Sequence, residues 1–190
     1  MQTIASFLMP RRIHLPPAEE RLVEVAPGIQ VRCWCRWQPD RASAPSIIAV
    51  HGLEGSSESE YMLGVARNGL SAGMNLVLMN QRNCGGMDHC APTLYNSSLS
   101  SDVAAVARHI IERDGTSRFG LVGFSMGGNL VLKLAGEWGS TGPAEFKAVA
   151  PNPELARRSM SWLALHSCAT AKRWANRSVR SRRASTRATI

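Results

Sequence analysis

The chain has 190 residues, a net charge of +8 and a pI near 9.9. No apolar run approaches the roughly 18 residues that a membrane-spanning helix needs, and the first nine residues are too short for a signal peptide. Five cysteines without a C-x-x-C pair argue against a disulfide framework or a zinc ribbon. The length suits one domain, and a cytoplasmic location is expected.

The first predicted elements are a hairpin and a buried strand. Residues 21–25 and 31–37 alternate between apolar and polar side chains around a Pro27-Gly28 turn, which predicts an antiparallel hairpin with one buried face. Residues 47–50 are all apolar and predict a buried parallel strand. His51-Gly52 is where this strand would open into a loop.

The middle of the chain alternates between helix and strand patterns. Residues 61–70 predict a helix that ends at Gly73, and residues 75–79 predict a strand. This alternation implies right-handed crossovers and a mostly parallel sheet with helices on both faces.

A second helix is predicted from the spacing of Leu99, Val103, Val106 and Ile110. Residues 96–98 are its candidate caps, and Gly115 is its expected end. The charge of Asp102 suits the positive end of the helix dipole.

The most informative motif is Gly123-Phe124-Ser125-Met126-Gly127. It follows an apolar strand pattern at 119–122 and precedes a helix pattern at 129–135, which we expect to end at Gly136 and Gly139. A G-x-S-x-G sequence between a strand and a helix is typical of an enzyme that exposes a nucleophilic serine on a tight turn. Residues 146–150 predict one more strand.

The candidate catalytic residues follow from this motif. Ser125 is the expected nucleophile, and the backbone N–H groups of Met126 and Leu53 are the expected oxyanion donors. Such donors are fixed before charge develops on the carbonyl oxygen, and each is worth roughly 3 kcal/mol of barrier. We expect Ser125 to have a strained or left-handed backbone.

Three segments carry a family resemblance: residues 51–56, with the sequence HGLEGS, residues 80–86, NQRNCGG, and residues 123–129, GFSMGGN. In this order they resemble the YheT-like branch of the α/β-hydrolases. The resemblance covers about residues 2–150 and implies a serine carboxylesterase for short or medium acyl esters or monoacylglycerols, with a Ser-Asp-His triad and no cofactor or metal. It also implies that the Arg82-to-Gly86 loop lines the mouth of the site.

The base and the acid of a triad are hard to find in this sequence. They are expected on loops after later strands, but no apolar run for a seventh or eighth strand follows residue 150, so the fold is expected to lack its C-terminal strands. No Asp or Glu follows Glu154 to supply the acid. His51 fits an ordering role in its loop better than a base role. His89 and His166 are weaker candidates for the base.

A metal interpretation is also open for the segment from Cys84 to Cys90, which contains Asp88 and His89, although the glycines and the resemblance explain that loop better.

The domain organisation is predicted as a partial α/β-hydrolase domain over 1–154 and a tail over 155–190. The tail carries nine basic residues and no acidic one, so the rest of the chain is close to neutral. Its composition predicts a disordered or weakly helical segment that contacts anionic membranes or polyanions weakly, without specific nucleic-acid binding. An out-of-frame or degenerate C-terminus is the interpretation we favour for the tail.

The sequence leaves two functional hypotheses. The first is a serine ester hydrolase, or a remnant of one with little activity. The second is a non-catalytic hydrolase fold with a basic tail that binds polyanions.

Overall fold

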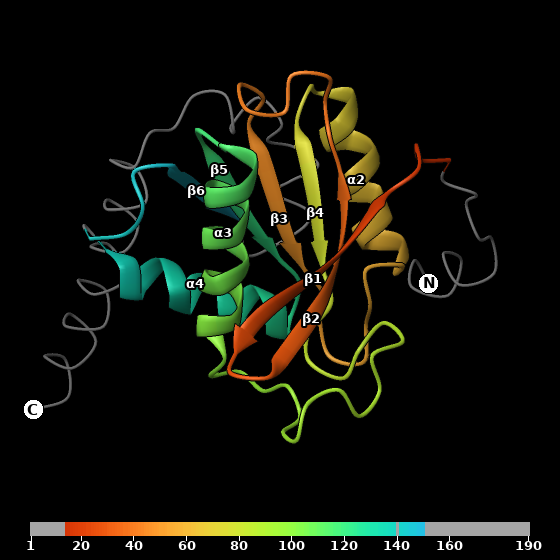
Figure 1. Ribbon diagram of the computed structural model, residues 1–190, viewed down its shortest axis with the longest axis vertical. Helices are drawn as coiled ribbons and strands as arrows, with labels where there is room; N and C mark the ends of the chain where they lie inside the picture. Colours follow the sequence, from red (N-terminus) through yellow and green to blue (C-terminus); the bar gives the residue numbers. More distant parts are fainter. Residues whose placement is uncertain (1–13, 140, 151–190) are drawn as a thin grey trace, which may run out of the picture.

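The computed structural model describes residues 14–139 and 141–150. In this part of the chain, one sheet has the strand order β1-β2-β4-β3-β5-β6, and helices cover it (Figure 1). The elements are β1 (Glu19–Ala26), β2 (Ile29–Arg36), β3 (Ser46–Val50), α2 (Glu60–Ser71), β4 (Asn75–Met79), α3 (Ser100–Asp114), β5 (Phe119–Gly123), α4 (Met126–Trp138) and β6 (Phe146–Ala150).

The central strands are buried on both faces. β3 is parallel to β4 and β5, and β5 is parallel to β6, whereas the β1–β2 hairpin is antiparallel and joins the sheet through β4. Every residue of β3, β4 and β5 is buried, as expected for parallel strands between helical layers. This arrangement confirms the predicted mostly parallel sheet.

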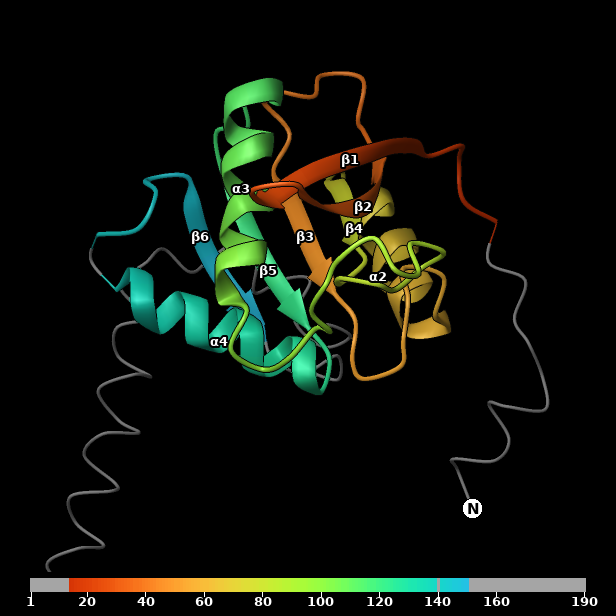
Figure 2. The same ribbon diagram turned by 60° about the horizontal axis from the view of Figure 1, so that its bottom comes forward.

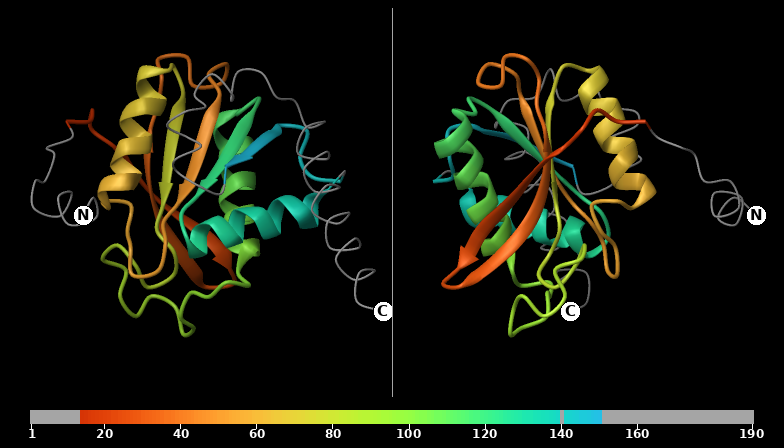
Figure 3. Two further views of the ribbon diagram at one scale, coloured as in Figure 1. Left: turned by 180° about the vertical axis from the view of Figure 1, so that it is seen from behind. Right: turned by 45° about the vertical axis from the view of Figure 1, so that its right-hand side comes forward.

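Two apolar layers lie on opposite faces of the sheet. Met62 and Ala66 of α2 pack on one face with Ile47 of β3, whereas α3 and α4 pack on the other face with Ile48. Figure 3 shows α2 opposite α3, with the hairpin extending on the α3 side. Neighbouring residues of β3 therefore belong to different layers, because side chains alternate along a strand.

The hairpin confirms the alternation seen in the sequence. Cys33 and Cys35 share the inner face of β2 and are buried, and the turn places Gly28 at φ 71°. Burial raises the pKa of the Cys35 thiol to about 12. These thiols are core residues and not reactive groups.

Two helix boundaries differ from the sequence predictions. The N-cap of α3 is Leu99, which makes no side-chain cap bond; Asn96 instead accepts a hydrogen bond from the Ser98 N–H at 2.9 Å, in a turn before the helix. The prediction of residues 96–98 as caps is therefore wrong. Gly136 does not end α4, because the helix continues to Trp138 and ends at Gly139.

The parallel strands direct the chain to one edge of the sheet. In Figure 2, the segment from β4 to α3 lies beyond the ends of the strands, near the start of α4. The loop after β3 and the turn after β5 reach this edge too, because the carboxyl ends of parallel strands meet there.

Candidate active site

Ser125 lies between the end of β5 and the first residue of α4. Its backbone has φ 51° and ψ −115°, so the expected strained conformation is confirmed. A residue other than glycine in such a region costs about 1–3 kcal/mol. The residue is exposed, and its side chain forms no cap bond to α4.

The glycines of the motif are required by close packing. A Cβ atom on Gly123 would lie 2.3 Å from the carbonyl oxygen of Gly127, and a Cβ on Gly127 would lie 2.4 Å from the carbonyl oxygen of Val50. Both distances are far below normal contact. The turn can therefore press against β3 only with glycine at these positions.

The loop after β3, residues 51–55, lies directly beside this turn. A Cβ atom on Gly52 would lie 3.1 Å from the Cβ of Ser125, and the Phe124 N–H donates a hydrogen bond to the Val50 carbonyl at 3.1 Å. We call residues 51–55 the oxyanion loop and residues 123–127 the elbow. These contacts place the loop that carries Leu53 beside the turn that carries Ser125 and Met126, the three residues that the sequence predicted as the site.

Most amides of the oxyanion loop have a partner. The Gly52 N–H donates to the Tyr61 hydroxyl at 3.3 Å, the Glu54 N–H donates to the Tyr95 hydroxyl at 2.9 Å, and the Gly55 N–H donates to the Gly52 carbonyl at 3.2 Å. Within the described residues, the Leu53 N–H has none. It is therefore available to a ligand.

The Met126 N–H is available for a different reason. Met126 is the first residue of α4, and the first amides of a helix have no carbonyl one turn before them. In the part of the chain that the structure describes, no acceptor is bonded to this amide. It also lies at the positive end of the helix dipole, which favours a negatively charged oxygen.

His51 is a structural residue of the loop. It is fully buried; its Nδ1 lies 2.7 Å from the Gly52 carbonyl oxygen, and its Nε2 accepts a hydrogen bond from the Gln81 N–H at 3.0 Å. An Nε2 that accepts carries no proton, so the ring is neutral and Nδ1 is the donor. Burial lowers the pKa of His51 and favours this state. Both nitrogens are occupied, which confirms the ordering role and leaves none for Ser125.

His89, another candidate base, is not bonded to Ser125 in the described part of the chain. It is exposed in the loop after β4 with φ 65°. His166 lies outside the described residues, as does the predicted tail over 155–190. Across residues 14–139 and 141–150, no three His, Cys, Asp or Glu side chains are grouped as metal ligands, which includes the segment from Cys84 to Cys90.

The loop after β4 is fixed by a buried ion pair that the sequence did not reveal. Arg82 binds Asp102 through two bonds, Nε to Oδ2 at 2.6 Å and Nη2 to Oδ1 at 2.7 Å, and donates to the Thr93 hydroxyl at 3.1 Å. The hydrogen bond to Asp102 raises the pKa of Arg82. Asp102 does lie in the first turn of α3, but its carboxylate also holds the loop to that helix.

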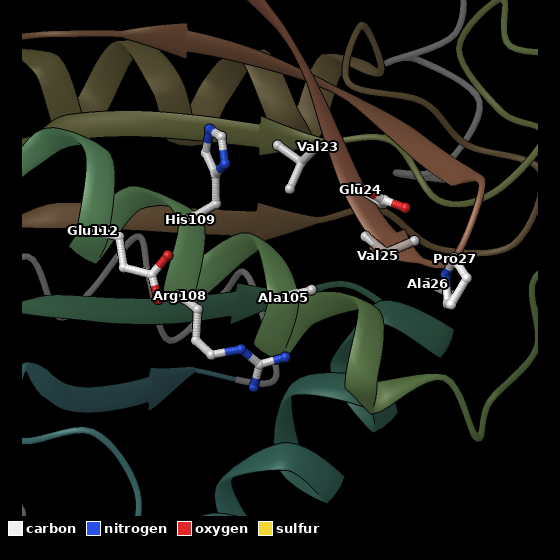
Figure 4. Close-up of a pocket in the computed structure, with 9 residues that line it drawn as sticks. All are labelled: Val23, Glu24, Val25, Ala26, Pro27, Ala105, Arg108, His109 and Glu112. Carbon is white, nitrogen blue, oxygen red and sulfur yellow. The ribbon is translucent and has the colours of Figure 1, made fainter.

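A groove elsewhere on the molecule shares no residue with this site. It has a volume of about 480 Å³ and lies between α3 and β1 with the hairpin turn (Figure 4). Its lining residues are Val23, Glu24, Val25, Ala26, Pro27, Ala105, Arg108, His109 and Glu112. None of these residues belongs to the elbow or the oxyanion loop, so the groove is separate from the candidate site.

Comparison with known proteins places this geometry in a family. The sequence model of the α/β-hydrolase fold matches residues 45–150, so the chain belongs to the α/β-hydrolase family. It is similar to the "Putative esterase YheT" of Escherichia coli (strain K12), with 28% identity over 80% of this chain and 45% of that protein. Phospholipase ABHD3 of Mus musculus is 29% identical over 73% of this chain and 36% of its own length.

Solved structures show the same fold. The esterase PF2001 of Pyrococcus furiosus superposes with a TM-score of 0.59 at 18% identity, covering 74% of this chain and 50% of that one. The chain spans less than half the length of the two curated relatives.

None of the helices in the described ranges has the length and hydropathy of a membrane-spanning segment.

Proposed function

We propose that this protein is a serine hydrolase of carboxylic esters, with Ser125 as the nucleophile. The observation that carries the proposal is an exposed serine, held in a strained conformation, near the amides of Leu53 and Met126, which have no partner among the described residues. The serine oxygen would give its proton to a base and attack the ester carbonyl carbon, whose C=O π bond opens to form a tetrahedral intermediate. Expulsion of the protonated alcohol would leave an acyl-enzyme, which water hydrolyses to the acid and free serine. The two amides and the helix dipole of α4 would stabilise the negative charge on its oxygen.

The proposed substrates are short or medium acyl esters or monoacylglycerols. Leu53 is 66% exposed and Leu94 is 72% exposed, so apolar side chains are available on the oxyanion loop and on the loop after β4. The relatives YheT and phospholipase ABHD3 have names that denote ester cleavage, which supports an ester as substrate.

A non-catalytic hydrolase fold is the second candidate, and one observation favours it. The His51 carbonyl oxygen lies close to Gly127 of the elbow, but both ring nitrogens are used within the protein. Without a base to accept the serine proton, an oxyanion hole alone retains a residual rate of about 10³–10⁴ over water. In this second candidate, the basic residues in 155–190 would bind polyanions; this segment lies outside the described residues.

A fluorophosphonate probe distinguishes these candidates, because it labels an activated serine. Labelling of the 190-residue chain that disappears in Ser125→Ala would support the hydrolase. Equal labelling of both proteins would exclude Ser125 as the nucleophile, and no labelling of either would favour the non-catalytic candidate.

Hydrolysis of p-nitrophenyl butyrate measures the turnover rate. We expect a turnover well below about 1 s⁻¹, which is an ordinary enzyme value. Turnover above that value, lost in both Ser125→Ala and His89→Ala, would identify His89 as the base.

A further inference from the structure

We propose that Tyr61 is a positioning residue that aligns the oxyanion loop with the elbow, assisted by Tyr95. This inference rests on the proposed function, because it concerns the donor at Leu53. Tyr61 lies in the first turn of α2. No pattern in the sequence distinguishes it from an ordinary half-exposed helix residue.

The Tyr61 side chain contacts both halves of the site. Its hydroxyl accepts the hydrogen bond from the Gly52 N–H at 3.3 Å, and its ring packs on that of Phe124 with a centroid distance of 4.4 Å and an angle of 39°. Phe124 directly precedes Ser125 in the elbow. One side chain therefore links the segment with the nucleophile to the segment with the donor.

The hydroxyl of Tyr61 also limits the shape of the loop. A Cβ atom on Gly55 would lie 2.4 Å from this oxygen, so the loop closes tightly around it. On the other side of Leu53, the Tyr95 hydroxyl accepts the Glu54 N–H at 2.9 Å. Two tyrosines from separate segments thus bind the amides that flank Leu53 in the chain.

This arrangement explains why the Leu53 amide is the one left available. A glycine-containing loop on the surface can rotate its peptide units, which would spread the donor over several directions. An oxyanion donor is effective because its direction is set before the reaction. Binding of the neighbouring amides by Tyr61 and Tyr95 supplies that restriction. Loss of the Tyr61 hydroxyl should therefore affect the chemical step more than substrate binding.

The test uses the full chain with Tyr61→Phe, Tyr95→Phe and a control, Thr116→Val. Thr116 is buried and its hydroxyl lies 3.4 Å from that of Ser46, at the amino end of β3 and away from the site. Amide hydrogen exchange of Gly52, Leu53 and Glu54 is measured by NMR. The rate of fluorophosphonate labelling, and kcat and KM for p-nitrophenyl butyrate, are measured on the same proteins.

We expect Tyr61→Phe to speed the exchange of the Gly52 amide at least about tenfold and to slow labelling and kcat about 10–100-fold, with KM within about twofold. Tyr95→Phe should likewise speed the exchange of the Glu54 amide and slow labelling. Thr116→Val should leave amide exchange, labelling, kcat and KM unchanged. Labelling by Tyr61→Phe at the unsubstituted rate would overturn the proposal.

The two proposals fail in different ways. If the unsubstituted chain is not labelled at all, the proposed function fails, and amide exchange alone decides whether Tyr61 holds the loop. Faster exchange at Gly52 in Tyr61→Phe then supports that structural part. Unchanged exchange overturns it.

Discussion

Ser125 is held in its strained conformation by its surroundings. The glycines on both sides of it let the elbow press against β3, and the Phe124 N–H bonds to Val50. These contacts outweigh the local cost of a positive φ at a residue with a side chain. A residue that is costly for stability and exposed to solvent is typical of a functional position.

This strain predicts the effect of removing the side chain at Ser125. Ser125→Gly should stabilise the fold by about 1 kcal/mol, because glycine adopts φ 51° at little cost. Ser125→Ala keeps the strained Cβ and should have a free energy of unfolding close to that of the unsubstituted chain. Urea unfolding measures both. A destabilised Ser125→Gly would show that the serine side chain supports the turn.

Two glycines of α4 offer a matched comparison. Gly127→Ala should destabilise the fold by about 1–3 kcal/mol, because its Cβ would lie 2.4 Å from carbonyl oxygens of Val50 and His51. Gly136→Ala should stabilise it by about 0.5–1 kcal/mol, because among the described residues nothing outside the local helix backbone lies within 4 Å of its Cβ. The shift in thermal midpoint of each variant tests this. Equal effects of the same sign would contradict the close approach at Gly127.

Among the elements, α3 is fixed to the hairpin by a buried carboxylate. Asp114, at the end of α3, bonds to Arg21 of β1 at 2.5 and 2.9 Å and to Arg41 at 2.9 Å, and its side chain is fully buried. Burial alone would raise the pKa of Asp114, but the bonds to Arg21 and Arg41 lower it below its ordinary value of 3.8. The charged form is therefore part of the folded structure.

This lowered pKa predicts how acid weakens the protein. The stabilisation from Asp114 is fully present above pH 3.8, and it is lost as the pH falls below this value towards the lower pKa of the folded state. Asp114→Asn should cost about 2 kcal/mol at pH 7 and reduce the slope of stability below pH 4. Urea unfolding at several pH values measures this. Glu58→Gln is the control, because Glu58 is exposed and its carboxylate has no ion-pair partner within the described residues; an identical slope in both variants would contradict the assignment.

The elements that the sequence predicted well are those with a local signal. The strands at 75–79 and 146–150 and the elbow are marked by apolar runs or by glycine spacing, and the structure has them at these positions. Contacts between distant segments leave no such signal. The bond from Glu54 to Tyr95 and the pair of Arg82 with Asp102 form only when the fold brings them together.

At the scale of the whole molecule, β3 joins the two apolar layers. Ile47 packs in the α2 layer and Ile48 in the layer of α3 and α4, and both are almost fully buried. Neither layer is complete without β3. Unfolding of one layer should therefore remove support from the other.

This shared strand predicts a single cooperative transition. Ile47→Val and Ile48→Val should each lower the free energy of unfolding by about 0.5–1.5 kcal/mol. Tryptophan fluorescence and far-ultraviolet circular dichroism should give the same midpoint for each variant, because both layers unfold together. Separate midpoints in either variant would show that the layers are independent.

The pairing of Val50 with Gly123 limits where residues can be inserted into this fold. Each strand residue advances the chain by about 3.3 Å, so one residue inserted into β3 or β5 would shift Ser125 past Leu53 by that distance. Residues inserted between Met79 and Ser100 would leave that pairing intact, because both ends of this segment are fixed to the sheet or to α3. Recombination with related genes should therefore keep β3 and β5 together and exchange the segment between β4 and α3, which lies near the candidate site.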